Sequence, residues 1–157
     1  MNNSLPLNKK KLEKLIFLIE ESLQSLKRFK DTPFEEFKQK KDNFRISFFD
    51  LHQALEAVMD IGNHILSRIP GARPERYKDI AKLMGEHNIV PSKFANGPLL
   101  KMAGYRNRMV HVYSEITIPE LYDIIQNNLQ DIEELSTHVK NLLTHSERFH
   151  LTISEDW

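Results

Sequence analysis

An arginine, a histidine and a tyrosine stand close together in the sequence, as Arg106, His111 and Tyr113. Arginine presents a permanently charged, planar fork to phosphate oxygens, and histidine has a pKa near enough to neutrality to give or take a proton. Such a pair suits cleavage of a phosphodiester without a metal ion: His111 acts as general base or general acid, and Arg106 stabilises the charge of the transition state. The spacing alone also fits a simpler arrangement, in which Arg106 pairs with a carboxylate and His111 is a core histidine.

A helix would decide whether these side chains meet. At 3.6 residues per turn, Arg106 and Tyr113 are seven positions apart and project to nearly the same side, whereas His111 lies two positions before the tyrosine. The three can therefore border one cleft only if the helix begins or bends nearby. Gly104 offers such a point, because glycine tolerates backbone conformations that other residues avoid.

A second group of polar side chains lies about fifty residues earlier in the chain. Glu56, Asp60 and His64 follow one another at four-residue steps, which places them on one face of a helix. Carboxylates and a histidine on one face can hold a metal ion. They can also form the wall of a cleft that another segment completes.

The composition is that of one globular domain. The chain has 157 residues, with 22 Lys and Arg against 22 Asp and Glu, and 40% of its residues are hydrophobic. A chain of this length buries roughly 70% of the surface that its unfolded form exposes, so it needs no disulfide or structural metal. With no cysteine, it lacks thiolate catalysis and cysteine zinc sites, and it fits a reducing compartment.

The apolar runs are short. None approaches the roughly 20 residues of a membrane-spanning helix, and the N-terminal residues lack the apolar stretch of a signal peptide, so we expect a cytoplasmic protein with no membrane contact. The neutral net charge argues against a broad basic surface that coats nucleic acid. The lysines at positions 9, 10, 11 and 14 fit a solvated helix face, with a nucleic-acid track as the minority interpretation.

Apolar periodicity predicts helices throughout. Apolar residues recur at steps of three and four, and no hairpin turn separates alternating apolar runs. The expected helices span about residues 8–30, 48–69, 74–88, 91–113 and 119–142, the fourth with a possible break at 96–98. Residues 1–145 form the predicted helical domain. Residues 146–157 change to an alternating pattern and form a tail, either a docked extended segment or a frayed end.

The motif has a family resemblance. The order arginine, four residues, histidine, one residue, tyrosine, within AGYRNRMVHVY, resembles the signature of the HEPN superfamily and specifically of its HepT toxins. The segment LEAVMDIGNHIL resembles that family's acidic, histidine-bearing helix, and IVPSKFANGPLLKMAGYRN resembles its approach to the motif. The resemblance covers about residues 44–143.

The resemblance implies an architecture, an activity and a partner. HepT proteins are all-helical homodimers that cleave RNA without a metal, and the arginine and histidine of both chains meet at a cleft across the dimer axis. They are paired with a minimal nucleotidyltransferase antitoxin, MntA, which adds AMP to the motif tyrosine. We therefore expect RNA as substrate, an MntA-like partner, and no metal or cofactor.

The family roles map onto residues of this chain. The resemblance assigns catalysis to Arg106 and His111 and the modification by AMP to Tyr113. It places four supporting side chains around the site, Asn107, Glu56, Asp60 and His64. Arg108 is a second cation inside the motif, at a position that varies in the family, and is expected to contact RNA or water.

The sequence thus predicts an all-α, HEPN-like bundle of about five helices that acts as the endoribonuclease toxin of a two-gene toxin–antitoxin system. The alternative is a HEPN module that binds a nucleotide or a partner protein without cutting RNA. A third possibility is a structural helical adaptor, in which neither Arg106 nor His111 matters.

Overall fold

The computed structural model describes residues 5–111 and 115–155. Its α-helices are α1 (Lys9–Lys27), α2 (Phe34–Gln39), α3 (Lys41–Leu66), α4 (Tyr77–Glu86), α5 (Ser92–Phe94), α6 (Leu100–Met109), α7 (Ile118–Asn127) and α8 (Leu129–Thr144). A π-helical turn, Ala95–Leu99, joins α5 to α6, and a 3₁₀ turn, Ser146–Phe149, follows α8. Two short strands, β1 (Leu7–Asn8) and β2 (Ile153–Ser154), pair in parallel. The predicted all-α helical bundle is confirmed.

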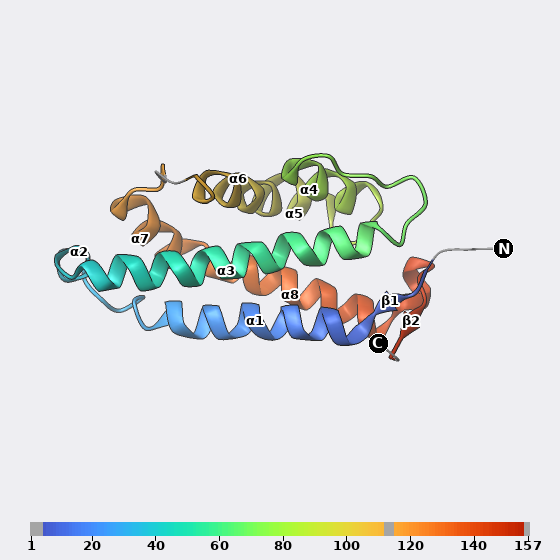
Figure 1. The fold of residues 1–157 in the computed structure, drawn as a ribbon, viewed down its shortest axis with the longest axis horizontal. Helices are drawn as coiled ribbons and strands as arrows, with labels where there is room; N and C mark the ends of the chain where they lie inside the picture. Colours follow the sequence, from blue (N-terminus) through green and yellow to red (C-terminus); the bar gives the residue numbers. More distant parts are fainter. Residues whose placement is uncertain (1–4, 112–114, 156–157) are drawn as a thin grey trace.

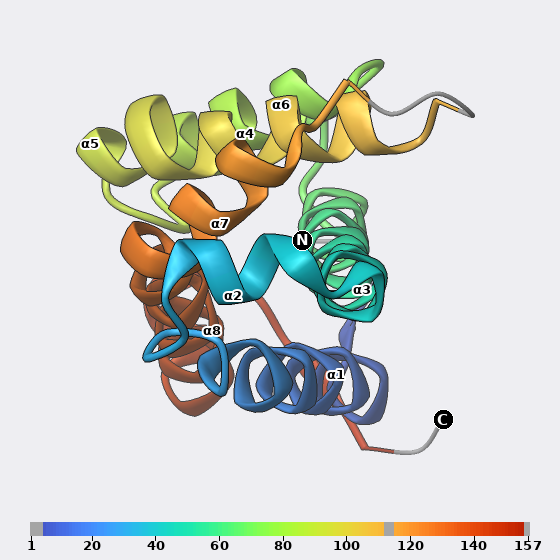
Figure 2. The same ribbon diagram turned by 90° about the vertical axis from the view of Figure 1, so that its left-hand side faces the viewer.

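The long helices α1, α3 and α8 run side by side, and α4, α5 and α6 form a layer over α3 (Figure 1). Figure 2 looks along these long helices and shows α2 and α7 across one end of the bundle. Helix α3 lies at the centre because apolar residues cover most of its circumference, among them the fully buried Leu51, Leu55 and Ile61. It therefore contacts α1 on one side and the layer that carries the motif on the other.

In three segments, the observed helices differ from those that apolar periodicity predicts. The predicted helix over residues 119–142 is two helices, because Asn128 has a non-helical φ of −121° and its side chain bonds to Asp131. A short helix, α2, starts after Pro33 in the stretch that the sequence analysis left without a helix. The possible break at residues 96–98 is a π-helical turn around Pro98, which has no N–H to donate. The described residues therefore hold more helices than the five expected.

Close packing brings α4 against α3. A Cβ atom on Gly62 would lie 2.3 Å from Cγ2 of Ile80, so only glycine allows this approach. Gly85 has the same role at the other end of α4, where an added Cβ would lie 2.6 Å from that of Ala95. The N-terminal end of α4 is thereby held beside the middle of α3.

Both ends of the described chain are tied to the C-terminal end of α3. The buried His64 accepts a hydrogen bond at Nε2 from the backbone N–H of Asn8, at 2.9 Å, and Nε of Arg68 donates to the carbonyl of Pro6, at 3.1 Å. The N–H of Leu7 donates to the carbonyl of Thr152, at 2.8 Å. Residues 146–155 of the tail are therefore a docked segment.

Over the described ranges, residues 5–111 and 115–155, no helix has both the length and the apolar character needed to cross a bilayer.

His64 should make stability depend on pH. Desolvation, assisted by the positive charges of Arg68 and Lys11, lowers its pKa from 6.5 to about 4. Between these values the unfolded chain binds a proton that the folded chain does not, so the free energy of unfolding falls as the pH is lowered from 6.5 to 4. The full effect is at most about 3 kcal/mol. Urea unfolding at pH 7 and pH 5 measures it.

The matched variant is His64→Gln, which keeps an acceptor but does not titrate. It should lose less stability than the parent between pH 7 and pH 5. Only in the parent can residue 64 of the unfolded chain bind a proton, which stabilises the unfolded state. Equal acid sensitivity of the two proteins would contradict this account.

Candidate functional site

Arg106 lies in the last turn of α6 and is held by two other helices. Its Nε and Nη2 atoms both lie 2.5 Å from Oε1 of Glu56 on α3. Its guanidinium carbon lies 3.9 Å from the ring centre of Tyr77, the first residue of α4. The side chain is only 14% exposed. The charge of Arg106 is thus clamped between a carboxylate and an aromatic face.

The clamp leaves part of the guanidinium open. Arginine has five N–H donors in a fixed plane, and Glu56 occupies the edge formed by Nε and Nη2. Within the part of the chain that the structure describes, no acceptor is recorded for Nη1 of Arg106. The N–H groups at that edge can donate a pair of hydrogen bonds to the oxygens of a phosphate.

The carboxylate side of the clamp has further neighbours on α3. Nε2 of His52 lies 3.8 Å from Oε1 of Glu56, and the His52 ring stacks on Phe48. Desolvation, reinforced by the charge of Glu56, raises the pKa of Asp60, against the opposing effects of Lys11 and Arg106. The fields of Arg106 and Glu56 therefore both reach Asp60.

His111 follows Arg106 by five residues in the chain. It lies two residues beyond the end of α6, in a bend, and is exposed. The simpler arrangement weighed in the sequence analysis is thus half met, because Arg106 does pair with a carboxylate but His111 is not in the core. Because its imidazole is exposed, His111 is accessible to a polymeric substrate.

The remaining predicted residues divide into three groups. Glu56 meets Arg106 directly, and Asn107 lines a hollow beside it. His64 lies eight residues along α3 from Glu56, about 12 Å away at 1.5 Å per residue, and bonds to Asn8 instead of entering this cluster. Tyr113 lies outside the described residues.

Arg108 forms its hydrogen bonds with other residues of the same chain. Its Nη1 and Nη2 atoms donate to the two carboxylate oxygens of Glu120 on α7, at 2.6 and 2.7 Å, and Nη2 also donates to the carbonyl of Glu115. The paired hydrogen bonds lower the pKa of Glu120. Arg108 thus ties α6 to α7, while its side chain stays 34% exposed, and contact with RNA or water stays a prediction.

Two site neighbours were not singled out from the sequence. Tyr77 falls in the helix expected over residues 74–88 and His52 in the helix expected over 48–69, and neither was given a role at the site. Their contacts with Arg106 and Glu56 join helices far apart in the chain, and no local pattern signals them. Among residues 5–111 and 115–155, no group of three or more histidines and acidic residues is placed to hold a metal ion.

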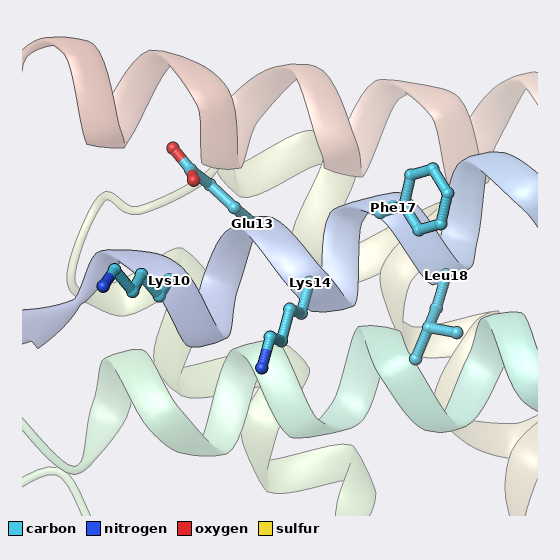
Figure 3. Close-up of a pocket in the computed structure, with 5 residues that line it drawn as sticks. All are labelled: Lys10, Glu13, Lys14, Phe17 and Leu18. Atoms are coloured by element: carbon cyan, nitrogen blue, oxygen red, sulfur yellow. The ribbon is translucent and has the colours of Figure 1, made fainter. Parts of the chain in front are cut away.

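A second hollow, of about 500 Å³, lies on α1 and includes part of the lysine run. Figure 3 shows its lining residues Lys10, Glu13, Lys14, Phe17 and Leu18, with the side chains of Glu13 and Lys14 on opposite sides of the helix. Lys9 pairs instead with Glu155 of the tail, at 2.9 Å. Since α3 separates α1 from the α4–α6 layer, this hollow is not part of the Arg106 cluster.

Comparison with known proteins gives consistent matches. A family model described as Ribonuclease HepT-like matches residues 19–139. The mRNA nuclease HepT of Shewanella oneidensis is 30% identical over 91 residues, which are 58% of this chain and 68% of that protein. The tRNA nuclease HepT of Aphanizomenon flos-aquae is 25% identical over 119 residues, 76% of this chain and 80% of that protein.

Solved structures agree in fold. The tri-AMPylated Shewanella oneidensis HEPN toxin in complex with MNT antitoxin superposes with a TM-score of 0.74, at 24% identity, over 83% of this chain and 97% of that chain. The cytosolic protein YutE of Bacillus subtilis has a TM-score of 0.74 at 21% identity, over 90% of this chain and 95% of that chain.

Proposed function

The chain belongs to the HepT-like ribonuclease family, and from that premise we propose that it is a metal-independent endoribonuclease in which Arg106 and His111 act on RNA. We further propose that it is the toxin of a two-gene system. Its partner is a nucleotidyltransferase antitoxin of the MntA kind, and the modified residue is Tyr113. The related toxin bound to MNT antitoxin supports this pairing.

The observation that supports the activity is the guanidinium of Arg106, held by Glu56 and Tyr77 with its Nη1 edge open, and followed five residues later by the exposed His111. In the proposed reaction, the ribose 2′-oxygen attacks phosphorus and the bond to the 5′-oxygen breaks. His111 takes the proton of the 2′-hydroxyl or gives one to the leaving oxygen, and Arg106 stabilises the charge on the phosphorus oxygens. The products are a 2′,3′-cyclic phosphate and a 5′-hydroxyl.

Glu56 is proposed as a positioning residue. Its single oxygen Oε1 receives two donors of Arg106, which fixes the plane of the guanidinium and aims the remaining donors away from α3. Tyr77 limits movement from the other side. A phosphate then meets a guanidinium that is already oriented, which saves the ordering cost at the moment of binding.

Replacing the imidazole should remove cleavage. His111→Ala should cut RNA roughly 100- to 10,000-fold more slowly, because a positioned acid–base group contributes that factor. The folded state should be unaffected, since His111 is exposed. Cleavage by the parent should persist in EDTA and leave a cyclic phosphate end, measured on labelled RNA.

The control is His87→Ala, which removes an exposed imidazole at the end of α4 and should cut like the parent. If His111→Ala matched the parent rate, the catalytic assignment would be lost. A parent that bound RNA or nucleotide but cut neither with nor without metal would establish the non-catalytic HEPN module instead.

A homodimer is proposed because apolar surface is left open next to the site. Phe49 on α3 is 64% exposed, seven residues before Glu56 and thus on the same helix face, and the exposed Ile46 lies one turn further back. Val110, next to His111, is also exposed. A second copy that covers this surface would place two Arg106–His111 pairs across one cleft.

Sedimentation tests the dimer. The parent should be dimeric at micromolar concentration, and Phe49→Glu should be monomeric, because a charge in a buried interface costs far more than it gains. The matched control is Phe17→Glu on α1, where a phenylalanine is 59% exposed away from the site, and it should stay dimeric. A monomeric parent, or equal effects of the two variants, would refute this interface.

Tyr113 is proposed to be the off switch. In the transfer, the phenol oxygen of Tyr113 bonds to the α-phosphorus of ATP, pyrophosphate leaves, and the phenolic proton is released. The attached phosphate would occupy the place that Arg106 offers to RNA and would repel the substrate. Support comes from the position of Tyr113, two residues after His111, and from the AMPylated state of the related toxin.

Intact mass after co-expression with the antitoxin measures the switch. Each AMP adds about 329 Da. Tyr113→Phe should show no such gain at this position and should resist the antitoxin's transferase activity. Tyr105→Phe is the control, since Tyr105 packs against the core and should not change the modification. A parent that is silenced while unmodified would point to occlusion by the bound partner.

A further inference from the structure

A hollow of about 640 Å³ lies between the beginning of α4 and the outer face of α6. Its wall on α4 includes Tyr77 and Lys78, and its floor on α6 includes Ala103, Gly104 and Asn107. Leu100 also lines this hollow from α6, and the backbone of α6 is reachable from outside at the exposed Gly104. The volume lies in the range of sites that hold a small organic molecule.

Gly104 has no structural explanation within the chain. It lies in the interior of α6, where glycine weakens a helix relative to alanine. A Cβ added there would meet no atom within 4 Å, unlike at Gly62 and Gly85, where neighbouring side chains forbid it. The backbone at Gly104 is therefore open to a molecule that approaches from the hollow.

Tyr77 links the hollow to the reactive cluster. The same ring that lines the hollow lies 3.9 Å from the guanidinium carbon of Arg106. A molecule in the hollow is thus one side chain away from the phosphate position at Arg106. The following residue on α6, Asn107, lines the hollow with an amide that can both donate and accept hydrogen bonds.

The charges at the rim of the hollow favour a ligand that carries phosphate groups. Arg76 and Lys78 stand on the α4 side with Glu75, and Arg106 adds a further positive charge behind Tyr77. The carboxylate of Asp79 accepts the backbone N–H groups of Glu75 and Arg76 and lies 3.9 Å from Nε of Arg76, so it offsets part of the charge of Arg76. The rim thus suits a flat, uncharged group attached to a phosphate chain.

We propose that this hollow is a subsite for one base of single-stranded RNA, the base adjoining the phosphate held by Arg106; this rests on the proposed ribonuclease function. The base lies against the open backbone at Gly104 and the ring of Tyr77, and Asn107 bonds to its edge. Arg76 and Lys78 meet the phosphates on either side. The subsite gives the enzyme a preferred base at the cleavage position.

The test measures binding of RNA that cannot be cut. A 2′-O-methyl oligonucleotide has no free 2′-hydroxyl, and one abasic site is moved along it while the dissociation constant is measured by fluorescence anisotropy. The parent should lose roughly 5- to 150-fold in affinity at one position, the range expected for one stacked base. Elsewhere the abasic site should matter little.

Gly104→Leu fills the hollow. It should bind the intact oligonucleotide as weakly as the parent binds the critical abasic one, and removal of that base should then cost nothing more. Gln130→Leu is the matched control, because it adds the same side chain at an exposed, neutral position of α8 outside the hollow. It should keep the parent's profile.

The outcomes separate the proposals. If Gly104→Leu showed the same dependence of affinity on the position of the abasic site as the parent, the subsite would be overturned. A monomeric Gly104→Leu would also overturn it, because the hollow would then belong to the contact with a partner chain. Because the probe is never cleaved, a protein that shows the profile but does not cut would overturn only the ribonuclease proposal. If Gly104→Leu did not fold, quenching of 2-aminopurine at the critical position in the parent would decide, and unquenched fluorescence would refute stacking.

Discussion

The ion pair between Arg106 and Glu56 is the contact on which the site depends. Both groups are partly buried, so each needs the other, and the loss of one would leave an unpaired charge in a poorly solvated place. The pair also joins two helices whose residues are fifty positions apart in the chain. The central helix α3 can supply Glu56 because its buried residues, such as Leu51, Leu55 and Ile61, hold it in the core.

Packing of α4 completes the clamp. The missing side chain of Gly62 lets Ile80 approach α3, and this contact sets the place of the whole helix. Tyr77, as the first residue of α4, then lies over Arg106, and the same ring forms a wall of the neighbouring hollow. One close contact in the core thus determines both the orientation of the guanidinium and the shape of the surface beside it.

The two arginines of α6 show how context divides one chemistry into two roles. Arg108 donates hydrogen bonds to the carboxylate of Glu120 and to the carbonyl of Glu115, and these bonds connect α6 to α7. Arg106 gives only one edge to Glu56 and keeps donors for an outside acceptor. Exposed apolar residues lie on the same elements, with Phe49 two turns before Glu56 on α3 and Val110 just after α6, which agrees with a site that a second molecule covers.

The sequence by itself determined the helical class, the long central helix and the motif of Arg106 and His111, because apolar periodicity and motif spacing are local properties of a chain. It did not reveal the break at Asn128, where a side-chain bond to Asp131 interrupts an apolar pattern that continues through it. Only the tertiary structure showed that Tyr77 faces Arg106 and that His64 serves the N-terminal strand. These contacts depend on how closely whole helices approach, and that distance is set by packing between residues far apart in the sequence.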